Sequence, residues 1–243
     1  MNLIETIALR RSGHHAVMSW YVKNLINIFN WDYQVTVMYG TKNIIWNDGG
    51  YLENEIEMVR NVGFKPDNIF INYEDKYSNF TFFQKDNIYK GAYRLDKYED
   101  FKFTTTKRIL IIRDFYNNLC SVIKQSSKGD DPHMTYDKKF INMWKDHAKS
   151  ILNDEIHHIK YEDWLTCDDC RKKFLQDVFG IKERVKKEQA KGTHSSYDTK
   201  STEYDYLNRF DATIIPDDVK KLIREDNELH YLIGALGYTY REI

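Results

Sequence analysis

The feature of this sequence that most constrains its fold is the alternation of short apolar, β-rich runs with amphipathic helical stretches. Strands are expected at residues 5–10, 35–39, 69–73, 108–112 and 156–161. Helices are expected at residues 14–28, 52–61, 115–128, 136–152, 168–179 and 216–236. Strands that alternate with helices favour a parallel sheet covered on both faces. We therefore expect an α/β fold with a central, mostly parallel sheet flanked by helices.

The 243 residues suffice for one sizeable α/β domain, and no shift in composition marks a second one. We expect a single domain over residues 1–243. Within it, residues 182–210 are polar and irregular, which indicates a long loop or a partly ordered segment.

Composition excludes several classes of protein. Aromatic residues make up 15% of the chain and there are only three prolines, so disorder is not its main state. The apolar runs are far shorter than the ~20 residues of a membrane-spanning helix. A net charge of -1 predicts no general attraction to nucleic acid or membrane. Three cysteines and no signal peptide favour a cytoplasmic location. The sequence does not indicate the oligomeric state.

The first candidate site is the turn between the first strand and the first helix. Arg11, Ser12 and Gly13 lie there, followed by His14 and His15 at the expected helix start. Backbone N–H groups and the positive end of a helix dipole favour an anion at such a turn. Arg11 adds a fixed charge and Ser12 a hydroxyl, and Gly13 permits close backbone approach. The alternative is a plain turn with solvent-exposed arginines.

The second candidate site lies where the apolar strand 108–112 ends. Arg113 follows the strand directly, Asp114 can cap the next helix, and Ser121 comes eight residues after Arg113. Open α/β sheets bind ligands at the carboxyl ends of their strands, and a guanidinium beside a hydroxyl suits a phosphate. The alternative is a structural Arg113 with Ser121 packed as a small helix residue.

Taken together, the two segments resemble the PAPS-dependent sulfotransferases, which use 3′-phosphoadenosine 5′-phosphosulfate (PAPS). Residues 9–15 resemble the 5′-phosphosulfate loop of that family, and residues 111–121 its 3′-phosphate motif. Residues 161–165 and 175–181 are similar to the family's Tyr-Glu-Asp-Leu and Phe-Leu-Gly-Ile segments. The resemblance spans residues 4–181. It implies a P-loop NTPase-like sulfotransferase arrangement, PAPS as donor, and cofactor binding by Arg11, Ser12, Gly13, His14, His15, Arg113 and Ser121.

The sequence departs from the family pattern in two places. Arg11 stands where the family usually has lysine, and arginine does not readily donate a proton. His14 and His15 stand where threonine is usual, so backbone N–H groups or imidazoles would replace the hydroxyls. The late Arg-Lys-Gly signature is not intact. Its expected counterpart, with a role in cofactor binding, consists of Lys191, Gly192 and Ser195.

Sulfuryl transfer requires charge neutralisation on the leaving bisphosphate and a base for the acceptor. Arg11 is the expected catalytic cation. Glu74, directly after the strand 69–73, is the expected base by resemblance, with His15 and Asp48 as rivals. The alternative is that Glu74 is a helix-start or surface carboxylate. Nothing in this chemistry requires a metal. The expected acceptor is a small molecule or glycan with a hydroxyl or amine, and Trp46 and the aromatic residues near it mildly favour a carbohydrate.

Two other functions stay open. A P-loop-type small-molecule or nucleotide kinase would carry a lysine in the loop, which is absent. A catalytically silent module that only binds PAPS or its product would be compatible with the changes at Arg11, His14 and His15. Cys167 and Cys170 have CxxC spacing, but the aspartates between them disfavour a reactive thiolate, and a solvated helix start is expected there.

Overall fold

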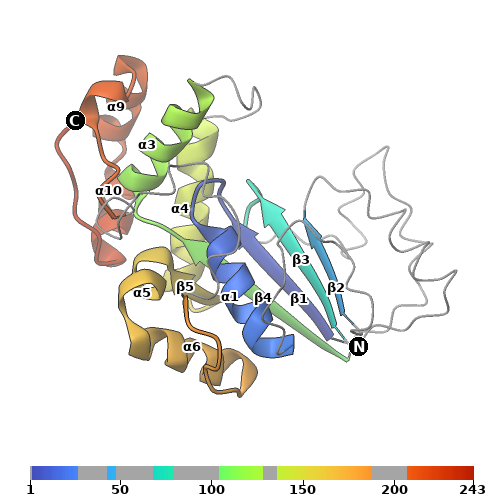
Figure 1. Ribbon diagram of the computed structural model, residues 1–243. Helices are drawn as coiled ribbons and strands as arrows, with labels where there is room; N and C mark the ends of the chain where they lie inside the picture. The colour runs from blue at the N-terminus through green and yellow to red at the C-terminus, as the bar shows by residue number, and fades with distance from the viewer. Residues whose placement is uncertain (1, 27–42, 48–67, 79–103, 128–135, 188–206) are drawn as a thin grey trace, which may run out of the picture.

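The computed structural model describes residues 2–26, 43–47, 68–78, 104–127, 136–187 and 207–243. Its strands are β1 (Asn2–Ala8), β2 (Asn43–Asn47), β3 (Asn68–Glu74), β4 (Thr105–Ile112) and β5 (His157–Lys160). They form one five-stranded sheet in the order β2-β3-β1-β4-β5, in which all neighbours run parallel (Figure 1). The expected α/β class with a parallel sheet is therefore confirmed.

The central strands are apolar on both sides because helices cover both faces of the sheet. Along β4, Ile109 and Ile111 pack into one hydrophobic cluster, whereas Leu110 and Ile112 pack into the other. All four are at most 1% exposed. This alternation follows from the two-residue period of a strand, and it explains why the run lacks polar residues.

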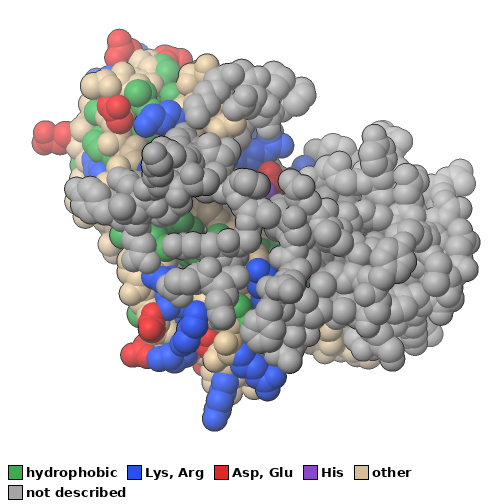
Figure 2. All heavy atoms as spheres, in the orientation of Figure 1, with side chains coloured by type: hydrophobic (Ala, Val, Ile, Leu, Met, Phe, Trp, Pro, Cys, Tyr) green, Lys and Arg blue, Asp and Glu red, His purple; other side chains and the backbone are tan. Residues whose placement is uncertain are grey.

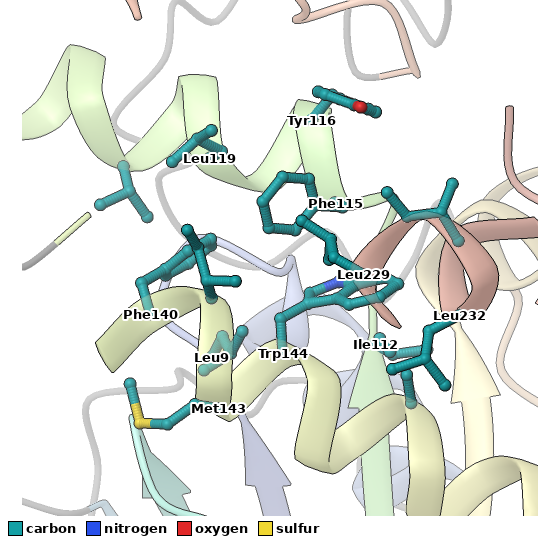
Figure 3. Packing of buried hydrophobic residues seen from close by; sticks show 14 of the residues in the cluster. Leu9, Ile112, Phe115, Tyr116, Leu119, Phe140, Met143, Trp144, Leu229 and Leu232 are labelled. Carbon is teal, nitrogen blue, oxygen red and sulfur yellow. The ribbon is translucent and has the colours of Figure 1, made fainter. Parts of the chain in front are cut away.

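One face of the sheet packs against α1 (His14–Ile26), α5 (Tyr161–Thr166) and α6 (Asp168–Phe179). The cluster on the other face includes residues of α3 (Phe115–Ser126), α4 (Lys138–Leu152), α9 (Asp217–Glu225) and α10 (Asn227–Ala235). A short 3₁₀ turn, η2 (Ala212–Ile214), precedes α9. Figure 3 shows the second cluster, with Phe115 of α3 and Trp144 of α4 facing Leu229 and Leu232 of α10.

The structure corrects several expected element boundaries; Glu74, for example, was expected directly after a strand and is the last residue of β3. The single helix expected at 216–236 is two helices, because the Asp226 side chain accepts a hydrogen bond from the Leu229 backbone N–H and caps α10. The strand expected at 156–161 ends at Lys160, and Tyr161 begins α5. The first strand ends at Ala8, so Arg10 belongs to the turn. The strand expected at 35–39 and the helix expected at 52–61 lie outside the described residues.

A disulfide joins Cys167 and Cys170, whereas the sequence reading expected only a solvated helix start. Cys167 is the N-terminal cap of α6, and its sulfur accepts a hydrogen bond from the Cys170 backbone N–H. The first turn of the helix thus brings the two Cα atoms to 5.2 Å, which is within the usual range for a disulfide.

Charges on the described surface are mixed in sign. Figure 2 shows basic side chains near α5 and α6 with acidic side chains among them. On α6, Lys172 pairs with Asp169 and Lys173 with Asp177. Among the described helices, none has the length and apolar character needed to cross a membrane. Of the segment 182–210, residues 188–206 lie outside the described part of the chain.

Candidate functional site

The candidate site lies where three neighbouring strands end. Ala8, the last residue of β1, is in register with Glu74 of β3 on one side and with Ile111 of β4 on the other. The turn that leaves β1 therefore runs between the segments that follow β3 and β4. This is the carboxyl edge of a parallel sheet, where open α/β folds bind their ligands.

The turn from β1 to α1 has an unusual backbone. Arg11 and Gly13 both have positive φ angles, of 64° and 83°. The Ser12 backbone N–H donates to the Leu9 carbonyl, and α1 begins at His14, directly after Gly13. The turn thus presents the N-terminus of a 13-residue helix to the sheet edge. That end carries the positive pole of the helix dipole, which favours an anion.

Gly13 is required here for a reason that the sequence did not reveal. A Cβ atom on Gly13 would lie 2.2 Å from Cε2 of Tyr161. Close approach of a backbone was expected at Gly13, but the group that approaches in the structure is the Tyr161 ring. Tyr161 belongs to the segment that resembles the family's Tyr-Glu-Asp-Leu run. The structure therefore joins two parts of the resemblance that are far apart in sequence.

A carboxylate–imidazole cluster lies on the β3 side of the turn. Glu74 Oε1 lies 2.8 Å from Nε2 of His14 and 2.6 Å from Nε2 of His15. Its other oxygen lies 3.3 Å from Nε of Arg10, which also pairs with Asp75 at 3.0 Å. The structure thus brings together His14, His15 and Glu74, three residues that the sequence analysis had singled out separately.

Burial differs within this cluster. His14 is 3% exposed, and burial followed by the nearby His15 lowers its pKa to about 4 despite the opposing effect of Glu74. Burial alone would raise the pKa of Glu74, but the contacts with His14 and His15 hold it below its usual range. The His15 side chain is 48% exposed. At neutral pH we therefore expect an ionised Glu74 and an uncharged His14.

Ser12 does not face solvent. It is 1% exposed, and its hydroxyl lies 3.3 Å from Nδ1 of His14. The hydroxyl can donate to or accept from that nitrogen, so it can satisfy either tautomer of the imidazole. In this structure Ser12 orients His14, while the expected phosphate contact of Ser12 stays a prediction.

A cluster of basic side chains lies on the β4 side of the turn. Arg113 is 2% exposed and follows β4 directly. Its Nη1 donates to the Arg11 carbonyl at 3.0 Å, and its guanidinium lies over the Tyr161 ring, 5.0 Å from the ring centroid. Burial, and after it the charge of Arg209, lowers the pKa of Arg113. Arg113 therefore joins the two expected phosphate segments directly.

Arg209 is a member of this cluster that sequence reasoning missed. Its Nη1 donates to the Ser121 hydroxyl at 3.2 Å, and its backbone N–H donates to Oδ1 of Asn117. Asn117 also donates to the Leu207 carbonyl, so α3 fixes the returning chain in place. Arg209 lies 88 residues after Ser121, and no spacing within the sequence signals their contact.

Two acidic residues, Asp114 and Glu162, hold this cluster of basic side chains in place. The Asp114 side chain accepts from the Asn117 backbone N–H and caps α3, as expected. Glu162 accepts from the Asp114 backbone N–H and from the Tyr238 hydroxyl, and its Oε1 lies 4.0 Å from Nε of Arg113. Burial, more than any other factor, raises the pKa of Glu162.

Several predicted site residues cannot be placed. Lys191, Gly192, Ser195 and Asp48 lie outside the described residues, so their expected roles stay predictions. Trp46 lies in β2, beside β3 in the sheet.

No protein-family model and no curated relative matches the sequence. The solved structures that match this chain include three from sulfotransferases. A sulfotransferase domain from the curacin biosynthetic pathway is 12% identical, with a TM-score of 0.44 and coverage of 99% of each chain. Mouse sulfotransferase SULT7A1 complexed with PAP is 13% identical, with a TM-score of 0.45 over 96% of this chain and 88% of that chain. A sulfotransferase domain from the Synechococcus PCC 7002 olefin synthase is 12% identical, with a TM-score of 0.40 over 99% and 96%.

Proposed function

We propose that this protein is a sulfotransferase that moves a sulfuryl group from PAPS to a hydroxyl or amine acceptor. One observation carries the proposal: two segments with phosphate-binding composition are held together at the sheet edge by the bond from Arg113 to the Arg11 carbonyl. A carboxylate–imidazole cluster lies on the other side of the same turn. Cations for a leaving bisphosphate and groups for a proton are therefore adjacent.

The residues present fit a ligand with two separated phosphates. Arg113, Arg209 and the Ser121 hydroxyl would hold the 3′-phosphate, because guanidinium groups bind phosphate through paired, charge-assisted hydrogen bonds. The α1 N-terminus and Arg11 would hold the 5′ end. Bound PAPS supplies an activated sulfuryl group and a bisphosphate leaving group. The positive charges at the turn then stabilise the negative charge that develops on that leaving group.

His15 is better suited than Glu74 to accept the acceptor's proton. The contacts that hold the pKa of Glu74 low make this carboxylate a weak base. The His15 side chain is half exposed and its Nε2 contacts Glu74, so the carboxylate can orient the ring while Nδ1 takes the proton. Glu74 would then act as a positioning residue. The preference for a carbohydrate acceptor rests on the sequence around Trp46 alone.

A thermal-shift titration tests the proposal. Adenosine 3′,5′-bisphosphate (PAP) at ~100 times its dissociation constant should add roughly 2.7 kcal/mol of stability, whereas ATP with magnesium should add far less. Incubation with PAPS labelled in the sulfuryl group, across hydroxyl and amine acceptors, should then yield a labelled product. Stabilisation by ATP alone would support a kinase instead. PAP binding without any labelled product would support a silent binding module.

A further inference from the structure

We propose that His14, His15 and Glu74 form a binding site for a divalent transition-metal ion, with Zn²⁺ as the best-suited occupant. The ligand atoms of these residues lie within 4.8 Å of one another. Two imidazole nitrogens and one carboxylate form the protein ligand set of several zinc sites that keep their fourth position open. The proposal does not depend on the sulfotransferase function, because it concerns the ligand atoms alone.

The convergence of the two imidazoles is the strongest structural argument. Successive residues on a helix point about 100° apart, so neighbouring side chains normally diverge. Here His14 and His15 open α1, their ring centroids lie 4.0 Å apart, and both rings direct Nε2 to the same oxygen of Glu74. That oxygen comes from β3, about 60 residues further along the chain. The three ligand atoms thus come from two rigid elements.

The distances suit replacement of the hydrogen bonds by a metal ion. The two N···O distances are 2.8 and 2.6 Å. In a tetrahedral zinc site, ligand atoms lie about 3.3 Å apart, as follows from metal–ligand bonds of about 2.0 Å. Each distance must therefore widen by well under 1 Å. The exposed side chain of His15 can supply the movement for its own contact, and the Glu74 side chain, which is partly exposed, can shift away from the buried His14.

The surroundings of the ligands also fit a metal. Coordination through Nε2 requires the proton of His14 on Nδ1, where the Ser12 hydroxyl can accept it, as outer hydrogen bonds commonly do for zinc-bound histidines. Arg10 contacts the other oxygen of Glu74, which disfavours a cation, but Asp75 pairs with the same guanidinium and offsets its charge. The half-exposed side chain of His15 gives an ion access from solvent, and Figure 2 shows histidine and acidic atoms adjacent at the surface.

Metal binding and proton transfer would use the same atoms. A zinc ion on Nε2 of His15 leaves the proton on Nδ1, so the imidazole has no lone pair for an acceptor proton. If the proposed sulfotransferase function holds, zinc should therefore inhibit it reversibly. This consequence rests on the proposed function, whereas the binding test below does not.

The test is a titration of the metal-free, full-length protein with zinc chloride, followed by calorimetry, without nucleotide and without reductant. The absence of reductant keeps Cys167 and Cys170 in their disulfide, so their sulfurs do not compete for zinc. Wild type should bind one Zn²⁺ saturably. His15→Ala and Glu74→Gln should each weaken binding by at least ~10-fold, because loss of a ligand costs no less than loss of its hydrogen-bond partner. Equal affinity in His15→Ala, or no saturable binding by wild type, would overturn the proposal.

His157→Ala is the matched control, because His157 is an exposed histidine at the start of β5. It lies at the amino ends of the strands, whereas the proposed site lies at their carboxyl ends. It should bind Zn²⁺ as wild type does. Cobalt(II) gives a second readout. The absorption of bound Co²⁺ should have the intensity of a four-coordinate ion in wild type and His157→Ala, and this signal should be lost in His15→Ala. A loss of zinc binding in His157→Ala equal to that in His15→Ala would also contradict the assignment.

Discussion

On the β4 side of the first turn, the buried guanidinium of Arg113 lies beside Arg209, which donates to the Ser121 hydroxyl. On the β3 side, one carboxylate is surrounded by two imidazoles. The first group is suited to an anion, and the second to a proton or a cation. Both sides depend on one short turn, because β1 lies between β3 and β4 in the sheet.

Because β1 is a central strand, the turn that follows it can contact the ends of both neighbouring strands. The Arg10 side chain contacts Glu74 and Asp75 at the end of β3, whereas the Arg11 carbonyl accepts from Arg113, which follows β4. Consecutive residues of one turn thus reach opposite sides. Four experiments can distinguish the contributions of the two sides.

The largest expected effect is on stability, from Gly13→Ala, which disturbs both sides at once. The new Cβ would lie 2.2 Å from the Tyr161 ring, at a φ of +83° that alanine rarely adopts. We expect the free energy of unfolding to fall by about 3 kcal/mol, the sum of a steric clash and backbone strain. Urea denaturation measures it.

Gly180→Ala is the matched control for this substitution. Gly180 also has a positive φ, of 69°, but nothing lies within 4 Å of the Cβ position. It should cost only about 1 kcal/mol, the strain alone. If the two variants are equally destabilised, the contact between Gly13 and Tyr161 does not constrain the turn.

The second effect should fall on the β4 side alone. Arg113→Ala should weaken PAP binding about 100-fold, because a hydrogen bond to a charged group contributes about 1.5–3 kcal/mol. Zinc affinity should stay within about twofold of wild type, because Arg113 does not contact the proposed ligands. Calorimetry with each ligand measures both.

Arg224→Ala, at an exposed arginine of α9, controls for the loss of one positive charge and should leave both affinities unchanged. A folded Arg113→Ala protein that binds PAP as wild type does would contradict the phosphate site. Arg113→Lys, which keeps the charge, guards against misfolding and should still lose at least about tenfold, because lysine lacks the planar fork.

A smaller effect is expected from Arg209→Ala. The variant loses one cation of the β4 side but keeps Arg113, so PAP affinity should fall about tenfold, equivalent to about 1.4 kcal/mol. The affinity should also depend less on salt, because one fewer charge pair is screened. A calorimetric titration at two salt concentrations measures both quantities. An unchanged affinity would mean that Arg209 only supports Ser121.

The strands could be predicted from sequence better than the contacts of the site. The four buried isoleucine and leucine residues at the end of β4 require cover on both faces, so this strand and the class of the sheet follow from the apolar run and its alternation with helices. The break between α9 and α10 at Asp226 was missed. The apolar residues keep their helical spacing through this position, whereas the cap depends on a single side chain. Helix α6 was predicted at its observed bounds, because Gly180 in the left-handed conformation ends it.

The site residues were found one at a time, but their grouping was not. The position of Glu74 at a strand end placed it near the site, and the parallel register brings it beside Ala8. Helix α1 begins at His14 as expected, but the contact of both histidines with one carboxylate oxygen also needs a partner from β3, about 60 residues away, and periodicity does not indicate that pairing. Arg209 was missed because its partners, Asn117 and Ser121, are reached only when the chain returns over α3.

The smallest expected effect concerns pH and should appear on the β3 side. His147 of α4 is fully buried, and its Nε2 lies 2.7 Å from the Lys76 carbonyl, two residues after Glu74. Burial lowers the pKa of His147, more than its bond to Lys76 raises it. The unfolded chain therefore binds a proton on this imidazole at a higher pH than the folded chain does. Stability from this group is present above pH ~6.5 and declines as the pH falls below that value.

His147→Gln should flatten the decline in unfolding free energy between about pH 7 and pH 5, by less than about 1.4 kcal/mol per pH unit. Urea denaturation across this range measures the slope, and His157→Gln, at an exposed histidine of β5, should retain the wild-type slope. The guanidinium groups of the β4 side stay charged throughout this range, so acid should loosen the segment after β3 before it loosens α3. Hydrogen exchange that rises equally in both segments would mean that the two sides of the turn do not respond separately to pH.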